Sequence, residues 1–88
     1  LLQAASTGNI QLIHMSLRMG GDLAEKGDDG STALHCAARA GHSEVVEYLL
    51  ALGARLQEMN EKGRSAFQEA IMGGDEKTVK VLLVAGVD

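Results

Sequence analysis

The stretch Gly30–Ala54 reads GSTALHCAARAGHSEVVEYLLALGA and decides the fold. It contains a helix start at Thr32, whose hydroxyl can accept a hydrogen bond from a free backbone N–H of the first turn. The residues that follow, Ala33–Ala40, are mostly small and apolar. They predict a short helix that neighbouring helices can approach closely, and Gly41-His42 interrupts it.

A second, more amphipathic helix is expected over Ser43–Leu52. Ser43 can cap its start, and Glu44 is favourable in its first turn because helix N-termini attract negative charge. Gly53 ends it, since glycine readily adopts the left-handed conformation that terminates helices. The expected buried stripe has helical spacing and consists of Val45, Val46, Leu49 and Leu50. The whole stretch therefore predicts a pair of helices.

The same unit recurs on both sides with a period of 33 residues and no insertion. The superposed sets are Gly8, Gly41 and Gly74; Gly20, Gly53 and Gly86; Ile13, Val46 and Val79; and Leu17, Leu50 and Leu83. One helix pair cannot bury its apolar face alone, whereas stacked copies bury a continuous core. We predict a single all-α solenoid domain over residues 1–88, with copies at about 1–29, 30–62 and 63–88, the first and last incomplete.

The second helix of copy three carries apolar residues on more than one side. Asp75 is expected to cap it, and its stripe is expected to comprise Val79, Leu82 and Leu83, with Val81 and Val84 as additional apolar residues. A terminal repeat is normally polar on its outer side. We therefore expect that the parent chain continues past residue 88 or that something packs on this helix.

Composition excludes several classes of function. The net charge of −4 argues against a nucleic-acid module, which needs a basic face. The single cysteine, Cys36, excludes an internal disulfide framework and a cysteine-based zinc cage. No apolar run approaches the roughly 20 residues that span a bilayer, so direct membrane insertion is not expected.

The quoted stretch resembles the ankyrin repeat, whose consensus reads G-x-T-P-L-H-x-A-A-x-x-G-H-x-x-V-V-x-x-L-L-x-x-G-A. The matching residues are Gly30, Thr32, Leu34, His35, Ala37, Ala38, Gly41, His42, Val45, Val46, Leu49, Leu50, Gly53 and Ala54. Ala33 replaces the consensus proline, and copy three departs further, with Ser65–Gln68 in place of T-P-L-H. The resemblance implies stacked antiparallel helix pairs with hairpin-like loops at Asp22–Ser31 and Arg55–Arg64.

The residues whose side chains could act in catalysis or metal binding are interpreted here as structural. The resemblance implies that His35 ties its helix start to neighbouring backbone; His42 sits at the break between helices, and His14 is expected to face solvent. Cys36 is interpreted as an inert core thiol, although Arg39 three residues on leaves a reactive thiolate as an alternative. A calcium loop at Asp28–Ser31 lacks its later ligands. We find no catalytic arrangement, metal site or cofactor site, and expect no enzymatic activity.

The resemblance places partner contacts at the loop tips and at exposed positions of the first helices. Carried over residue by residue, the candidate partner-binding residues are Asp28, Asp29, Ser31, Arg39, Ala40, Glu61, Lys62, Arg64 and Met72. The first loop is acidic and the second slightly basic. We therefore hypothesise a protein or peptide partner with a basic patch opposite Asp28 and Asp29, bound in a salt-dependent manner.

Three functions fit these observations. The first is a protein–protein interaction module, acting as a scaffold, adaptor or regulator inside a larger intracellular protein. The second is a regulatory or substrate-recruiting segment of a larger multidomain enzyme or channel. The third is a structural stretch that spaces other binding regions.

Overall fold

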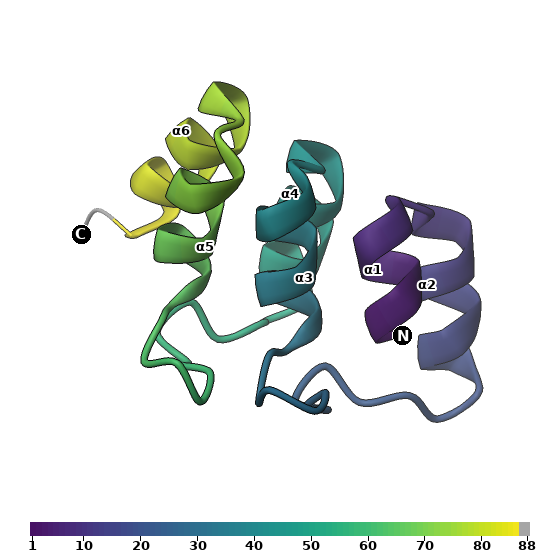
Figure 1. Cartoon of the computed structure of the whole chain (residues 1–88). Coiled ribbons are helices and arrows are strands. Elements are labelled where there is room, and N and C mark those ends of the chain that lie inside the picture. The colour runs from purple at the N-terminus through teal and green to yellow at the C-terminus, as the bar shows by residue number, and fades with distance from the viewer. Residues whose placement is uncertain (87–88) are drawn as a thin grey trace.

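Three helix pairs stand side by side, and two loops project from the same edge of the stack (Figure 1). The structure is a computed structural model that describes residues 1–86, so the last two residues assigned to copy three lie outside the described part. The six helices are α1 (Leu2–Thr7), α2 (Ile10–Arg18), α3 (Ala33–Ala40), α4 (Ser43–Ala51), α5 (Ala66–Gly73) and α6 (Glu76–Gly86). Residues 1–86 contain no strand. The predicted all-α architecture of antiparallel pairs is confirmed.

The first helices of copies two and three begin with the same reciprocal capping arrangement. The side chain of Thr32 accepts from the N–H of His35, and the His35 side chain accepts from the N–H of Thr32. Ser65 and Gln68 repeat this arrangement at the start of α5, with 2.9 Å between the Ser65 nitrogen and Gln68 Oε1. Such reciprocal caps satisfy two backbone donors that the helix leaves free. Gln68 therefore preserves the capping role of the histidine that it replaces.

The second helix of copy two has its N-cap at His42, one residue before the predicted cap Ser43. Asn9 and Asp75 each accept from a backbone N–H in the first turn of α2 and α6. His42 is the N-cap of α4, but its side chain makes no capping bond; its Nε2 instead lies 2.9 Å from the carbonyl oxygen of Ser6. Ser43 is a buried residue of the first turn, so its predicted capping role is wrong.

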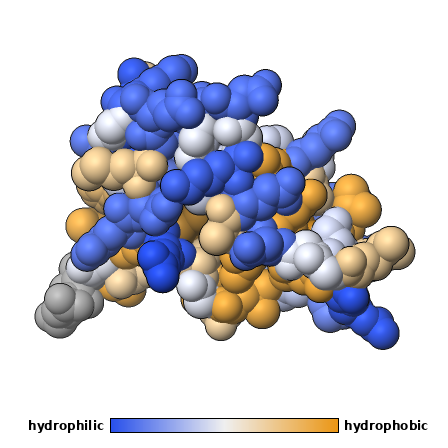
Figure 2. Space-filling model, turned by 90° about the horizontal axis from the view of Figure 1, so that it is seen from below, coloured by the Kyte–Doolittle hydropathy of each residue, from blue (hydrophilic) through white to orange (hydrophobic). Residues whose placement is uncertain are grey.

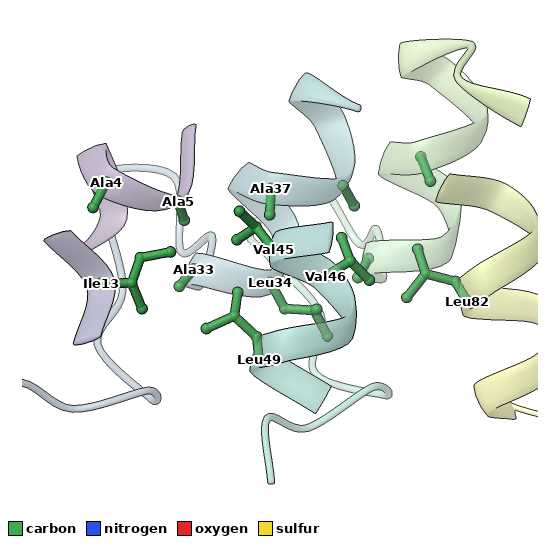
Figure 3. Packing of buried hydrophobic residues seen from close by; sticks show 13 residues of the cluster. Ala4, Ala5, Ile13, Ala33, Leu34, Ala37, Val45, Val46, Leu49 and Leu82 are labelled. Atoms are coloured by element: carbon green, nitrogen blue, oxygen red, sulfur yellow. The ribbon is translucent and has the colours of Figure 1, made fainter. Parts of the chain in front are cut away.

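The core is a continuous band that crosses all three pairs (Figure 3). Alanines dominate where the first helices meet, and longer side chains fill the space between first and second helices. The fully buried residues include Ala5, Ala37, Ala38 and Ala70 in the first row, and Ile13, Leu34, Leu49 and Leu82 beside it. Each copy therefore supplies part of a core that no copy completes alone.

The predicted buried stripe of α6 is only partly correct. Leu82 is buried and Val79 is half-buried, but Leu83 is 53% exposed. The equivalent Leu17 and Leu50 are half-buried, and each has a following copy beside it within the described chain. Leu83 has no such copy among residues 1–86, so the same register position is open to solvent.

The two loops turn tightly and are fastened to each other. The N–H of Gly27 donates to the carbonyl of Ser31 at 2.9 Å, and the N–H of Asn60 donates to that of Arg64 at 3.0 Å, which closes the same turn in each loop. The N–H of Glu61 then donates across to the carbonyl of Asp29 at 2.8 Å. The loop edge is therefore a connected surface rather than two independent loops.

Gly73 allows α5 to lie close to α3. A Cβ built on this residue would lie 2.4 Å from the carbonyl oxygen of Arg39, a backbone atom that cannot move aside cheaply. We expect Gly73→Ala to destabilise the protein by about 1–2 kcal/mol, because overpacking outweighs the roughly 1 kcal/mol by which alanine favours helix. Urea unfolding measures the change.

The matched control is Gly86→Ala at the end of α6, where, among residues 1–86, the added Cβ would meet the flexible Leu56 Cδ2 at 3.2 Å. The control should change stability by less than about 0.5 kcal/mol. A gain in stability for Gly73→Ala would contradict the close approach of the two helices.

Candidate interaction surface

Figure 2 shows the molecule from below, the side on which the loops project in Figure 1. Hydrophilic residues cover the upper part of this view, and hydrophobic residues gather in its lower half. Asp28 in the first loop and Glu61 and Lys62 in the second are exposed. The tips of both loops therefore present charged groups to solvent.

Behind the tips lies a cluster of polar side chains, the Arg39 cluster, which comprises Asp29, Ser31, Arg39, Asn60 and Glu69. Arg39 extends from α3 and places Nη2 2.7 Å from Glu69 Oε2 on α5. The same nitrogen lies 3.1 Å from Ser31 Oγ and 3.4 Å from Asp29 Oδ2 in the first loop. One guanidinium thus joins two helices and a loop.

Asn60 joins the second loop to the same cluster. Its Nδ2 lies 2.7 Å from Glu69 Oε2 and 3.3 Å from Ser31 Oγ. Its Oδ1 accepts from the N–H groups of Lys62 and Arg64, each at 3.0 Å. Asn60 therefore holds its own loop in shape and attaches that loop to the carboxylate of α5.

Glu69 is only 2% exposed and depends on these partners. A buried carboxylate is costly unless it is paired and hydrogen-bonded. The hydrogen bond from Arg39 lowers the pKa of Glu69 against the opposing effect of burial. The same bond raises the pKa of Arg39. Both shifts favour the charged pair, which is therefore the form that holds α3 and α5 together.

The Asp29 carboxylate interacts mainly with its own loop and to a lesser extent with Arg39. Hydrogen bonds from Ser31 are the largest cause of the lowered pKa of Asp29, and the charge of Arg39 adds to it. The Ser31 N–H lies 3.0 Å from Asp29 Oδ1. The Asp29 carboxylate is therefore already engaged inside the molecule.

The nine candidate partner-binding residues fall into two groups. Asp28, Ala40, Glu61, Lys62 and Met72 are exposed and lie outside the Arg39 cluster, while Arg64 is half-buried. Asp29, Ser31 and Arg39 belong to the cluster. Ser31, placed above among the candidate partner contacts, is only 2% exposed and accepts from both Arg39 and Asn60. Contact of the remaining residues with a partner stays a prediction.

Sequence reasoning missed Asn60 and Glu69. Both lie at positions where the copies differ: Asn60 takes the position of Gly27, and Glu69 takes the position of Cys36 and Gln3. Cys36 was interpreted as a core thiol, so the position of Glu69 was expected to be buried. A carboxylate at a buried position of the first helix indicates that an ion-pair partner lies nearby. Arg39, on the first helix of the preceding copy, is that partner.

The histidines have structural contacts. His35 is buried; its Nδ1 lies 3.1 Å from the Thr32 nitrogen and its Nε2 2.9 Å from the Arg64 carbonyl oxygen. A carbonyl only accepts, so Nε2 carries the proton and Nδ1 accepts from the Thr32 N–H. The interpretation that His35 ties its helix start to neighbouring backbone is confirmed. His14 is exposed, as expected, and contacts the Tyr48 hydroxyl.

No group of three or more histidine, cysteine or acidic side chains among the described residues could hold a metal ion. Within the same part of the chain, no helix is long and apolar enough to cross a membrane. Cys36 is a half-buried free thiol.

The sequence model for ankyrin repeats, three copies, matches residues 1–88. The chain belongs to the ankyrin-repeat family. The match confirms the family resemblance and the solenoid fold class, and ankyrin repeats are generally protein–protein interaction modules. No curated protein matches the chain.

The Arg39–Glu69 pair can be measured by a double-mutant cycle with Arg39→Met and Glu69→Gln. We expect a coupling energy of about 1–2 kcal/mol, because Glu69 is buried while the Arg39 side chain is 44% exposed. The control cycle uses Glu76→Gln and Lys80→Met, an exposed pair one helical turn apart on α6. That pair should couple by only about 0.3–0.5 kcal/mol. Equal coupling in both cycles would contradict the structural role of Arg39.

The pair also predicts how stability depends on pH. The folded-state pKa of Glu69 is lowered, so its contribution is complete above the unfolded value of about 4.3 and is lost as pH falls through the folded value. The stability difference between the native protein and Arg39→Met should therefore shrink as pH is lowered from 6 to about 3. Urea unfolding at several pH values measures it, and a difference that stays constant would exclude Glu69 as its origin.

Proposed function

We propose that this ankyrin-repeat chain is an interaction module of a larger intracellular protein, where it acts as a scaffold, adaptor or regulator and catalyses no reaction. It binds a protein or peptide through the loop tips and the exposed positions of the first helices. The family supports this proposal because ankyrin repeats are generally protein-binding modules.

The observation that carries the proposal is the attachment of the two loops to each other and to α3. The Asp29 carbonyl accepts from Glu61, and Lys26 Nζ lies 3.0 Å from Glu58 Oε1, which joins the two loops a second time. His35 fastens the second loop to α3. Loops held in one arrangement lose little entropy on binding, which favours recognition.

The carboxylates that we propose for partner contact differ from the two that were named from the sequence. Asp28 and Glu61 occupy the same position of consecutive repeats, are exposed, and form no ion pair within residues 1–86. Asp29 is engaged by Ser31 and Arg39. The acidic pair that a basic partner would meet is therefore Asp28 and Glu61, rather than Asp28 and Asp29.

The test compares two charge-reversed variants as baits in affinity capture from a cell lysate. Asp28→Lys with Glu61→Lys alters the tips, while Glu44→Lys with Glu76→Lys makes the same charge change on the exposed faces of the second helices. We expect the tip variant to lose a partner that the other retains, with at least a tenfold loss of affinity for the isolated partner at low salt. Asp29 is left intact so that the Arg39 cluster stays closed.

The opposite pattern would overturn the proposal. A partner that is retained by the tip variant and lost by the second-helix variant binds the other face. A partner whose affinity is the same for both variants and independent of salt does not use these charges.

A further inference from the structure

The outer side of the second helices contains two junctions, and the tyrosine at the first is replaced by a valine at the second. At the α2–α4 junction, the half-buried Tyr48 packs against the core, and its hydroxyl lies 3.1 Å from Nδ1 of His14. A large ring with a satisfied hydroxyl therefore spans this junction. At the α4–α6 junction, the equivalent residue is Val81, which is smaller and has no polar group.

A groove of about 440 Å³ lies where that ring is missing. Its apolar lining consists of Leu50, Val81, Val84 and Ala85. Val84 is 73% exposed, and the neighbouring Leu83 is 53% exposed. The groove therefore has the apolar floor that an aromatic ring requires.

The charged residues at the rim give this groove a different electrostatic character from its neighbour. Glu47 occupies the position that His14 has at the first junction. Lys77 and Lys80 also line the groove, in the positions where Glu44 and Glu47 flank Tyr48. Lys80 is paired with Glu76 at 3.2 Å, whereas Lys77 forms no ion pair within residues 1–86. The rim thus offers one carboxylate acceptor and an unpaired cation.

We propose that the α4–α6 groove binds a tyrosine side chain carried by an acidic segment of a partner protein. The ring covers Val81 as the ring of Tyr48 covers the first junction. Its hydroxyl donates to Glu47, since a phenol at an apolar surface needs a polar partner. A carboxylate next to the tyrosine pairs with Lys77. This site lies on the second helices and does not depend on binding at the loop tips.

The test follows the methyl resonances of Leu50 and Val81 by NMR while a peptide is added to the intact chain. The probe is the blocked tripeptide Glu-Tyr-Glu, and the comparison peptides are Glu-Phe-Glu and Lys-Tyr-Lys. We expect saturable shifts in the millimolar range for the probe. Loss of the hydroxyl should weaken binding by about threefold to tenfold, and the basic peptide should bind more weakly than the probe.

Two variants locate the site. Val81→Tyr should fill the groove from within, raise the melting temperature and abolish the shifts at Leu50. Glu47→Gln, on an exposed position, should leave stability unchanged and reduce the preference for tyrosine over phenylalanine. Because Glu47→Gln tests the hydroxyl contact without altering the core, the proposal remains testable if Val81→Tyr fails to fold.

Three results would overturn the proposal. The first is the absence of shifts at these methyls up to the solubility limit of the probe. The second is equal binding of all three peptides, which would show a nonspecific apolar surface. The third is a shift of these methyl resonances that depends on protein concentration in the absence of peptide, together with a dimeric mass in sedimentation. That result would assign the groove to a second copy of this chain.

Discussion

The structure depends on the close approach of the first helices. Ala5, Ala38 and Ala70 have no side chain beyond Cβ and are fully buried, so α1, α3 and α5 can lie near enough for one to complete the core of the next. At Gly73 the approach is so close that even an added Cβ would clash with the backbone of α3. Short helices of six to eight residues are not stable alone. The packing between these helices therefore also stabilises their helical conformation.

Close packing leaves the polar groups at the ends of the helices to be satisfied across copies. Nε2 of His35 reaches the Arg64 carbonyl in the next copy, and Nε2 of His42 reaches the Ser6 carbonyl in the previous one. The Arg39 cluster does the same with charged groups, since Arg39 and Glu69 come from consecutive copies. Each contact sets the position of one copy on its neighbour. The orientation of the loop tips is thus fixed by bonds that lie behind them.

The repeat allowed the fold to be predicted in detail, because a period of 33 residues constrains every copy at once. The helix starts at Thr32 and Ser65 follow from capping residues at the same position of two copies, whereas the structural role of His35 follows from the resemblance to the ankyrin repeat. The errors have local causes. Ser43 was chosen as a cap for its residue type, although Asn9 and Asp75 mark the position one residue earlier. Ser31 was treated as a free loop position because its partners, Arg39 and Asn60, lie far away in sequence and meet it only in the folded stack.

Departures from the repeat carry the information that is particular to this chain. A residue shared by all copies is explained by stacking, so it says little about what the protein binds. Glu69 in place of Cys36 creates a buried charge that ties two copies together, and Val81 in place of Tyr48 leaves a groove between α4 and α6. Asp28 and Glu61 are a different case, because both copies keep an acidic residue at this position although neither residue forms an ion pair within residues 1–86. The repeated acidic residue, for which residues 1–86 provide no ion-pair partner, and the groove at a position where the copies differ are the two features that packing alone does not explain.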